Sequence, residues 1–223
     1  LKMHGGVAKD DLGKEDVAAL QKGLENLGKH LDNLAQFGVG AVVAINQFTA
    51  DTEAEMAAIS TYCQDRGVEA HVCSHWANGG AGAESLAHKV VELAQSGKSD
   101  FHTLYGDELP LWEKMQTVAR RIYGADDISA NRTVRARFQQ LQDQGYGHLP
   151  ICVAKTQYSF STDPSRKGAP TGHEVSVREV RLAAGAEFLV VVCGDIMTMP
   201  GLPRRPAAEA IGLDDDGQIT GLF

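Results

Sequence analysis

Two strand-to-loop-to-helix junctions follow one another between Ala44 and Gly82, and they constrain the fold of this chain more than any other feature. In the first, an apolar run ends at Ile45 and a helix begins near Asp51. In the second, an apolar run ends at Cys73 and leads through a glycine-rich loop to another helix. Such alternation predicts parallel strands joined by helical crossovers. Loops at the carboxyl ends of such strands are where ligands usually bind.

Each of these loops carries one large aromatic residue, Phe48 in the first and Trp76 in the second. Only 6% of the residues are aromatic, so matched positions on consecutive loops are notable. Two readings stay open at this point. The two side chains fill space in the core, as aromatic residues usually do, or they face each other across a gap that accepts a flat ring.

The composition is that of an ordinary globular protein, with 43% hydrophobic and 22% charged residues. A net charge of −8 argues against a nucleic-acid partner. No apolar run approaches the roughly 20 residues that a membrane helix needs, so no membrane partner is expected. The start shows no export signal, and we expect a cytoplasmic piece of a longer protein. Four separated cysteines without a Cys-x-x-Cys pair are expected to be buried and reduced.

The remaining pattern predicts further helices and strands. Helices are expected over residues 14–36, 51–66, 84–95, 110–123 and 131–144, and strands over 39–45, 68–73, 151–154 and 187–193. The fold class is therefore α/β, a mostly parallel sheet flanked by helices with a helical subdomain insertion. Residues 1–100 are expected to form an α/β lobe, 101–148 a helical segment, and 149–223 the strands and loops that complete the sheet and the site.

The glycine-rich loop contains Gly79, Gly80 and Gly82 just before a helix. Backbone amides in such a loop can bind an anion, and the helix dipole would assist them. The alternative is a tight turn that needs glycine for its backbone angles. Neither of the usual nucleotide-binding glycine motifs is present in the chain.

Other candidate sites are weaker. His71, Cys73 and His75 alternate along a strand, but no fourth ligand is evident, so no metal site is predicted. Asp195 follows an apolar strand, as a magnesium-linked aspartate does in phosphate-loop NTPases, but the lysine loop that would accompany it is missing. No serine- or cysteine-based catalytic arrangement is recognisable.

At these same residues the sequence resembles the formate–tetrahydrofolate ligase family, over nearly the whole chain and as its carboxyl-terminal two-fifths. The matching motifs are Leu1-Lys2-Met3-His4-Gly5-Gly6, Ala44-Ile45-Asn46-x-Phe48-x-x-Asp51-Thr52-x-Ala54-Glu55, Trp76-x-x-Gly79-Gly80-x-Gly82, Ala154-Lys155-Thr156-Gln157-Tyr158-Ser159, the run 194–203 and the terminal 219–223.

The resemblance implies a multidomain enzyme related to phosphate-loop NTPases. In it, ATP phosphorylates formate, and a tetrahydrofolate nitrogen attacks the resulting formyl phosphate. It implies that Phe48 and Trp76 hold the pterin ring between them. It also implies an adenine-binding loop at Pro170, Thr171 and Gly172. Folate or anion binding is expected at two further loops, one with Gly79, Gly80 and Gly82 and the other with Thr198, Pro200 and Leu202.

The implied cofactors are ATP with Mg²⁺, tetrahydrofolate as a substrate, and a monovalent cation. The implied partners are the amino-terminal remainder of the same enzyme, small-molecule substrates and further copies in a homotetramer. The phosphate loop and the catalytic residues would lie in that remainder, so no catalytic residue is predicted here and the chain alone should be inactive. The alternative is a non-catalytic α/β ligand-binding or interaction module.

Overall fold

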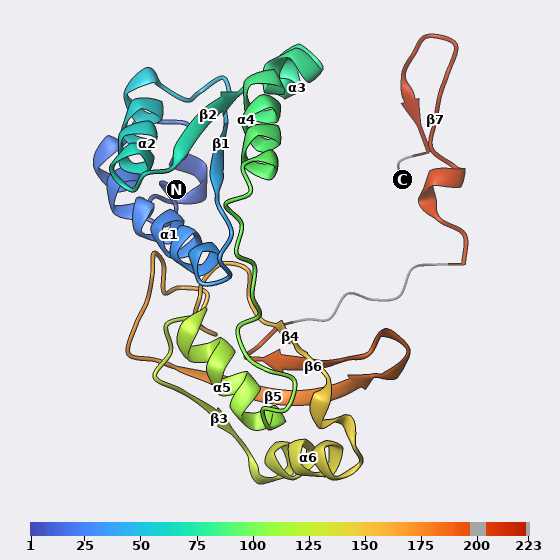
Figure 1. The fold of residues 1–223 in the computed structure, drawn as a ribbon. Coiled ribbons are helices and arrows are strands. Elements are labelled where there is room, and N and C mark those ends of the chain that lie inside the picture. Colours follow the sequence, from blue (N-terminus) through green and yellow to red (C-terminus); the bar gives the residue numbers. More distant parts are fainter. Residues whose placement is uncertain (197–203, 222–223) are drawn as a thin grey trace.

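A computed structural model describes residues 1–196 and 204–221 (Figure 1). The α-helices are α1 Val17–Ala35, α2 Glu53–Asp65, α3 His75–Asn78, α4 Glu84–Gln95, α5 Leu111–Arg121 and α6 Arg132–Asp143. The strands are β1 Val42–Asn46, β2 Glu69–Cys73, β3 Asp127–Ala130, β4 Ile151–Ala154, β5 Glu174–Ala183, β6 Phe188–Cys193, β7 Gly212–Leu213 and β8 Ile219–Thr220. Short 3₁₀ turns lie at Lys9–Asp11, Gly79–Ala83, Tyr146–His148, Ala184–Ala186 and Ala207–Glu209.

The first lobe, residues 1–95, is built on the parallel pair β1 and β2, whose register runs from Val42 opposite Glu69 to Asn46 opposite Cys73. Helices α1 and α2 pack on one face of this pair. Their shared core consists of Leu20, Leu24, Ile45, Ile59 and Cys63. Helix α4 lies against the other face, where Lys89 pairs with Glu69 and Ser85 hydrogen-bonds His71.

The helix starts follow local chemistry that the sequence makes visible. Asp16 caps α1 by accepting a hydrogen bond from the amide of Ala19 at 2.8 Å. Thr52 caps α2 by accepting from the amide of Glu55 at 3.3 Å, as the predicted capping box requires. Both caps satisfy amides that have no partner within the helix. They fix where α1 and α2 begin, and hence the loop that precedes α2.

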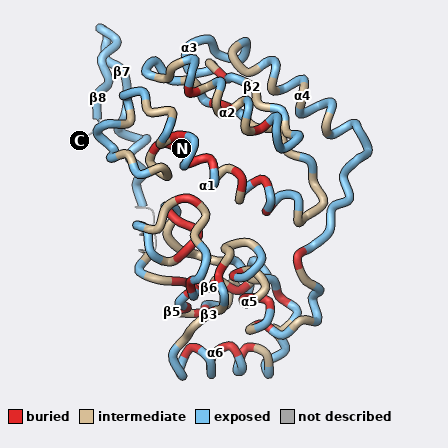
Figure 2. The backbone as a smooth tube through the Cα atoms, turned by 90° about the vertical axis from the view of Figure 1, so that its left-hand side faces the viewer, coloured by how far each residue is buried: buried red, intermediate tan, exposed pale blue. Residues whose placement is uncertain are grey.

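The second lobe, residues 104–196, is a four-stranded sheet in the order β3-β5-β6-β4. The outer pairs β3–β5 and β4–β6 are parallel, and the central pair β5–β6 is antiparallel. Helices α5 and α6 cover this sheet. The fully buried residues of this core include Leu111, Met115, Leu141, Val175 and Val191. Figure 2 shows buried backbone gathered along α1 and in this sheet, whereas α3 and α4 are mostly exposed.

The mixed α/β class and the parallel strand pairs are confirmed, but the prediction of one mostly parallel sheet is wrong. The described strands form a two-stranded parallel sheet, a separate four-stranded mixed sheet and the short β7–β8 hairpin. Strands β3 and β5 were not predicted. Residues 101–148 hold the two expected helices together with β3, and both helices pack on the second sheet. The division of the chain at residues 100 and 148 stays a prediction.

Helix α1 connects the two lobes through side-chain donors on its surface. Asn26 Nδ2 donates to Gly168 O, Lys29 Nζ to Arg121 O and Asn33 Nδ2 to Ile122 O, each at 3.0 Å. These hydrogen bonds to backbone carbonyls help to hold the two lobes together. Within the described part of the chain, no helix has both the length and the apolar character needed to cross a membrane.

Candidate functional site

The loops after β1 and β2 lie side by side, because the two strands are parallel neighbours that end together at Asn46 and Cys73. The ladder continues one step further, since the amide of Gln47 donates to Cys73 O at 2.9 Å. The indole Nε1 of Trp76 then donates to Gln47 O at 2.7 Å. This bond ties the Trp76 loop to the residue that precedes Phe48. The two aromatic residues singled out from sequence are thus brought to one edge of the sheet.

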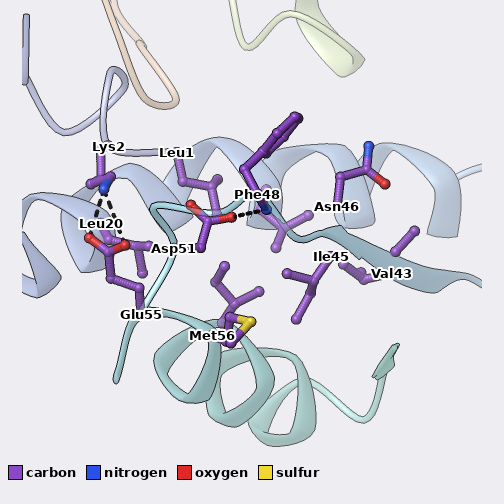
Figure 3. Close-up of a pocket in the computed structure, with 13 residues that line it drawn as sticks. Leu1, Lys2, Leu20, Val43, Ile45, Asn46, Phe48, Asp51, Glu55 and Met56 are labelled. Atoms are coloured by element: carbon purple, nitrogen blue, oxygen red, sulfur yellow. Dashed lines mark hydrogen bonds and ion pairs between the residues drawn. The ribbon is translucent and has the colours of Figure 1, made fainter. Parts of the chain in front are cut away.

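Both aromatic side chains are exposed, Phe48 by 62% and Trp76 by 57%. The core-packing reading is therefore wrong for both of them. Large exposed aromatic surfaces cost free energy in water unless something covers them. Phe48 points away from the strand in Figure 3, on the same side as the exposed Asn46. The edge therefore presents two flat apolar faces with polar groups beside them.

The Phe48 loop is shaped by Asp51. The carboxylate of Asp51 accepts a hydrogen bond from the amide of Phe48 at 2.8 Å, and the amide of Asp51 donates to Phe48 O at 3.1 Å (Figure 3). This closed turn fixes the backbone at Phe48 just before α2 begins. The aromatic side chain is thus presented from a stable turn rather than from a loose loop.

The glycine-rich loop folds back on the residue that follows β2. The amide of Ser74 donates to Gly82 O at 3.0 Å, and a Cβ atom at Gly82 would lie 2.6 Å from the carbonyl carbon of Ser74. Gly82 is therefore needed for a close backbone contact. Gly79 has a φ of +59°, which favours glycine, whereas Gly80 has open space around it. An anion-binding role for Gly79, Gly80 and Gly82 stays a prediction.

A cavity of about 360 Å³ lies beneath Phe48 between β1, α1 and α2 (Figure 3). Its apolar lining comes from Leu1, Leu20, Leu27, Val43, Ile45, Met56 and Ile59. At one end, Lys2 and Glu55 form a buried ion pair at 2.9 Å. Burial alone would raise the pKa of Glu55, but the hydrogen bonds from the Asp16 amide and Lys2 Nζ, with the Lys2 charge, hold that pKa below its usual value.

The predicted adenine loop belongs to the second lobe and not to the edge with Phe48 and Trp76. Arg166 Nη2 donates to Thr171 O at 2.6 Å, Gly172 has a φ of +64°, and Pro170 is partly buried. The loop is thus ordered by its own neighbours, with Thr171 and Gly172 exposed. The residues Thr198, Pro200 and Leu202 lie outside the described residues. The roles predicted for both loops stay untested.

Lys155, for which no role was predicted, lies just after β4 beside a second cavity of about 260 Å³. Its ammonium lies 4.8 Å from the Tyr123 ring centroid and donates to the carbonyls of Thr156, Ser159 and Ser161. Burial lowers the pKa of Lys155 to about 8. The only sequence signal was its place in the Ala154–Ser159 motif at a strand end.

Among the described residues, no group of three His, Cys, Asp or Glu side chains is placed to hold a metal ion. In particular, His71 hydrogen-bonds Ser85 at 2.6 Å and lies near Glu69, while Cys73 is buried. The His71, Cys73 and His75 alternation therefore assembles no ligand set here.

Comparison with known proteins gives one family. The profile of the family described as formate–tetrahydrofolate ligase matches residues 1–223. Relatives named formate–tetrahydrofolate ligase share 59% identity in Ruegeria pomeroyi, 60% in Rhizobium etli and 58% in Granulibacter bethesdensis, each over all 223 residues. The chain spans about 40% of the length of these relatives. It belongs to the formate–tetrahydrofolate ligase family.

Proposed function

We propose that this chain is the tetrahydrofolate-binding part of a parent enzyme that ligates formate to tetrahydrofolate. In the proposed reaction ATP phosphorylates formate, and the tetrahydrofolate nitrogen displaces phosphate from formyl phosphate to give 10-formyltetrahydrofolate. The observation that carries the proposal is the exposed pair Phe48 and Trp76 on adjacent strand-end loops, in a chain of this family.

A pterin ring suits this edge physically. Its flat faces match two aromatic side chains, and offset stacking supplies about 0.5–1.5 kcal/mol per pair beyond the buried area. Its polar rim needs hydrogen-bonding partners, and the exposed Asn46 lies next to Phe48 at the end of β1. The indole nitrogen is already used by Gln47 O, which holds the Trp76 ring in place before a ligand arrives. Such preorganisation lowers the entropy that binding must overcome.

The remaining roles are proposed from the family. The loop at Pro170, Thr171 and Gly172 would line the adenine of ATP, and the segment 198–202 would close over folate or formyl phosphate. The phosphate loop and the catalytic residues would lie in the rest of the parent, a multidomain enzyme related to phosphate-loop NTPases. We further propose a cytoplasmic homotetramer. We also propose that the parent uses ATP with Mg²⁺ and a monovalent cation, and no residue of this chain is assigned to either cation.

The proposal is tested by steady-state kinetics of the parent enzyme carrying Trp76→Ala. We expect the KM for tetrahydrofolate to rise about tenfold or more, because a stacking face of about 1–2 kcal/mol is lost. The KM for ATP should stay within about twofold, since Trp76 lies at the edge of the β1–β2 pair and the predicted adenine loop belongs to the second lobe. Phe101→Ala is the matched control, because Phe101 is 66% exposed and lies outside both loops. Equal effects on both substrates would count against a pterin site.

Two simpler observations bear on the division of labour. The 223-residue chain alone should show no ligase activity with formate, ATP and tetrahydrofolate. The sequence of the parent before Leu1 should contain a G-x-x-x-x-G-K-[ST] phosphate loop. A parent without that loop would instead favour the non-catalytic ligand-binding module.

A further inference from the structure

One edge of β1 has no strand beside it in the part of the chain that the structure describes, where β1 pairs only with β2. Successive residues of a strand direct their amides to opposite edges. The Gln47 amide points to β2, so the amides of Val43 and Ile45 also point to β2. The amides of Ala44 and Asn46 therefore point to the open edge. Parallel sheets are normally buried and have more than two strands. The open edge of β1 therefore marks an incomplete sheet.

The positions of α1 and α2 indicate what completes it. Both helices lie on the same face of the β1–β2 pair and share one core. The crossover from β1 through α2 leads to β2 on one side of β1. Crossovers between parallel strands are right-handed in about 98% of cases. A strand that feeds α1 on the same face must therefore lie on the opposite side of β1, which is the open one.

The geometry at this edge fits that arrangement. The cavity of about 360 Å³ lies along β1 between α1 and α2, and it is lined mainly by apolar side chains (Figure 3). Leu1 lines the same cavity, and Figure 3 shows it beside Asp51 and Phe48, at the carboxyl end of β1. A strand parallel to β1 would deliver the chain to this end. Helix α1 would then carry it back to the start of β1.

We propose that the segment of the parent ligase immediately before Leu1 forms a strand parallel to β1, giving the order preceding strand, β1, β2. This inference rests on the proposed function, since it takes the segment from the parent enzyme, of which the chain spans about 40% by comparison with its relatives. The strand is about 5 residues long and rich in apolar side chains, some of which fill the cavity. Its carboxyl end places a third loop beside Phe48 at the proposed folate site.

Hydrogen exchange with residue-level resolution tests the proposal. Three proteins are compared: the 223-residue chain, the same chain extended by about 12 residues of the parent before Leu1, and the whole parent. We expect the Ala44 and Asn46 amides to exchange at least about 100-fold more slowly in the two longer proteins. The Val43 and Ile45 amides, which bond β2, should be protected in all three and serve as the internal control.

A pair of proline variants gives a second readout. Proline is tolerated where a strand amide faces an open edge and disrupts the strand where the amide is paired. We therefore expect Ala44→Pro to lower the Tm of the parent by several degrees and to leave that of the 223-residue chain almost unchanged. Val43→Pro, its control, should lower the Tm of both.

The outcomes separate this inference from the proposed function. Rapid exchange of Ala44 and Asn46 in a parent that has ligase activity overturns the strand and leaves the function standing. Slow exchange of these two amides in a parent that lacks ligase activity supports the strand and overturns the proposed function. Protection of these amides in the whole parent that grows with its concentration would assign the edge to a second copy and would also overturn the proposal.

Discussion

Removing the carboxylate of Glu55 should destabilise the first lobe strongly, because two groups depend on it, the Asp16 amide and the Lys2 ammonium. Glu55 Oε1 accepts from the Asp16 amide at 2.8 Å, and the carboxylate pairs with Lys2 at 2.9 Å. The side chains of Lys2 and Glu55 are only 8% and 3% exposed. In Glu55→Ala the Lys2 charge stays buried, and among the described residues the Lys14 carbonyl is its remaining hydrogen-bond partner. The pair thus joins the first residues of the chain to the start of α2.

The magnitude follows from this geometry. Breaking a buried ion pair by removing one partner costs about 3–5 kcal/mol. The bond from Lys2 Nζ to Lys14 O at 2.8 Å remains, so we expect the low end, about 3 kcal/mol of unfolding free energy. Glu55→Gln keeps an acceptor for Asp16 and should lose only about 1–2 kcal/mol.

Urea unfolding of the 223-residue chain, followed by circular dichroism, measures these differences. The control is Glu53→Ala, because Glu53 lies in the same first turn of α2 but is exposed. Its effect should stay within about 0.5 kcal/mol. If Glu55→Ala and Glu53→Ala unfold at the same urea concentration, the reasoning about this buried pair is refuted.

The remaining predictions concern pH and two contacts in the loops. The folded-state pKa of Glu55 is lowered, so the stabilisation that the Glu55 carboxylate gives is present above the usual glutamate pKa and is lost as the pH falls through the lowered value. The difference in unfolding free energy between wild type and Glu55→Ala should therefore shrink in acid. Burial lowers the pKa of Lys155 to about 8, so above that pH the unfolded state binds more protons than the folded state. In chemical unfolding, wild type should therefore gain stability relative to Lys155→Met as the pH rises from 8 to 9. Gly82→Ala should lower the Tm by several degrees, since its Cβ would overlap the Ser74 carbonyl, whereas Gly80→Ala, with open space around it, should not.

The features of the fold that depend on local chemistry could be predicted from the sequence. The apolar spacing of α1, the Thr52 cap of α2 and the apolar runs of β1, β2 and β6 all lie where the residues indicated, within a few positions. Strand β5 was missed because its buried residues alternate with exposed polar and charged ones, whereas the prediction relied on continuous apolar runs. Strand β3 is only four residues long and carries little pattern.

Long-range pairing set the limits of prediction. The Lys2–Glu55 pair joins residues 53 positions apart, and no local signal connects them. Likewise, the split into two sheets depends on β5 pairing with both β3 and β6. The positions of Phe48 and Trp76 were predictable, because strand-end loops of adjacent parallel strands must meet at one edge. Their exposure decided against the core-packing reading.

The measurement that tests the central claim most directly is the Kd of tetrahydrofolate for the parent enzyme in four forms: wild type, Phe48→Ala, Trp76→Ala and the Phe101→Ala control. If the pterin ring lies between Phe48 and Trp76, each of the two site variants should raise the Kd about tenfold or more, and Phe101→Ala should leave it within about twofold. A Kd that is the same in all four forms would contradict the assignment of this edge to the pterin ring.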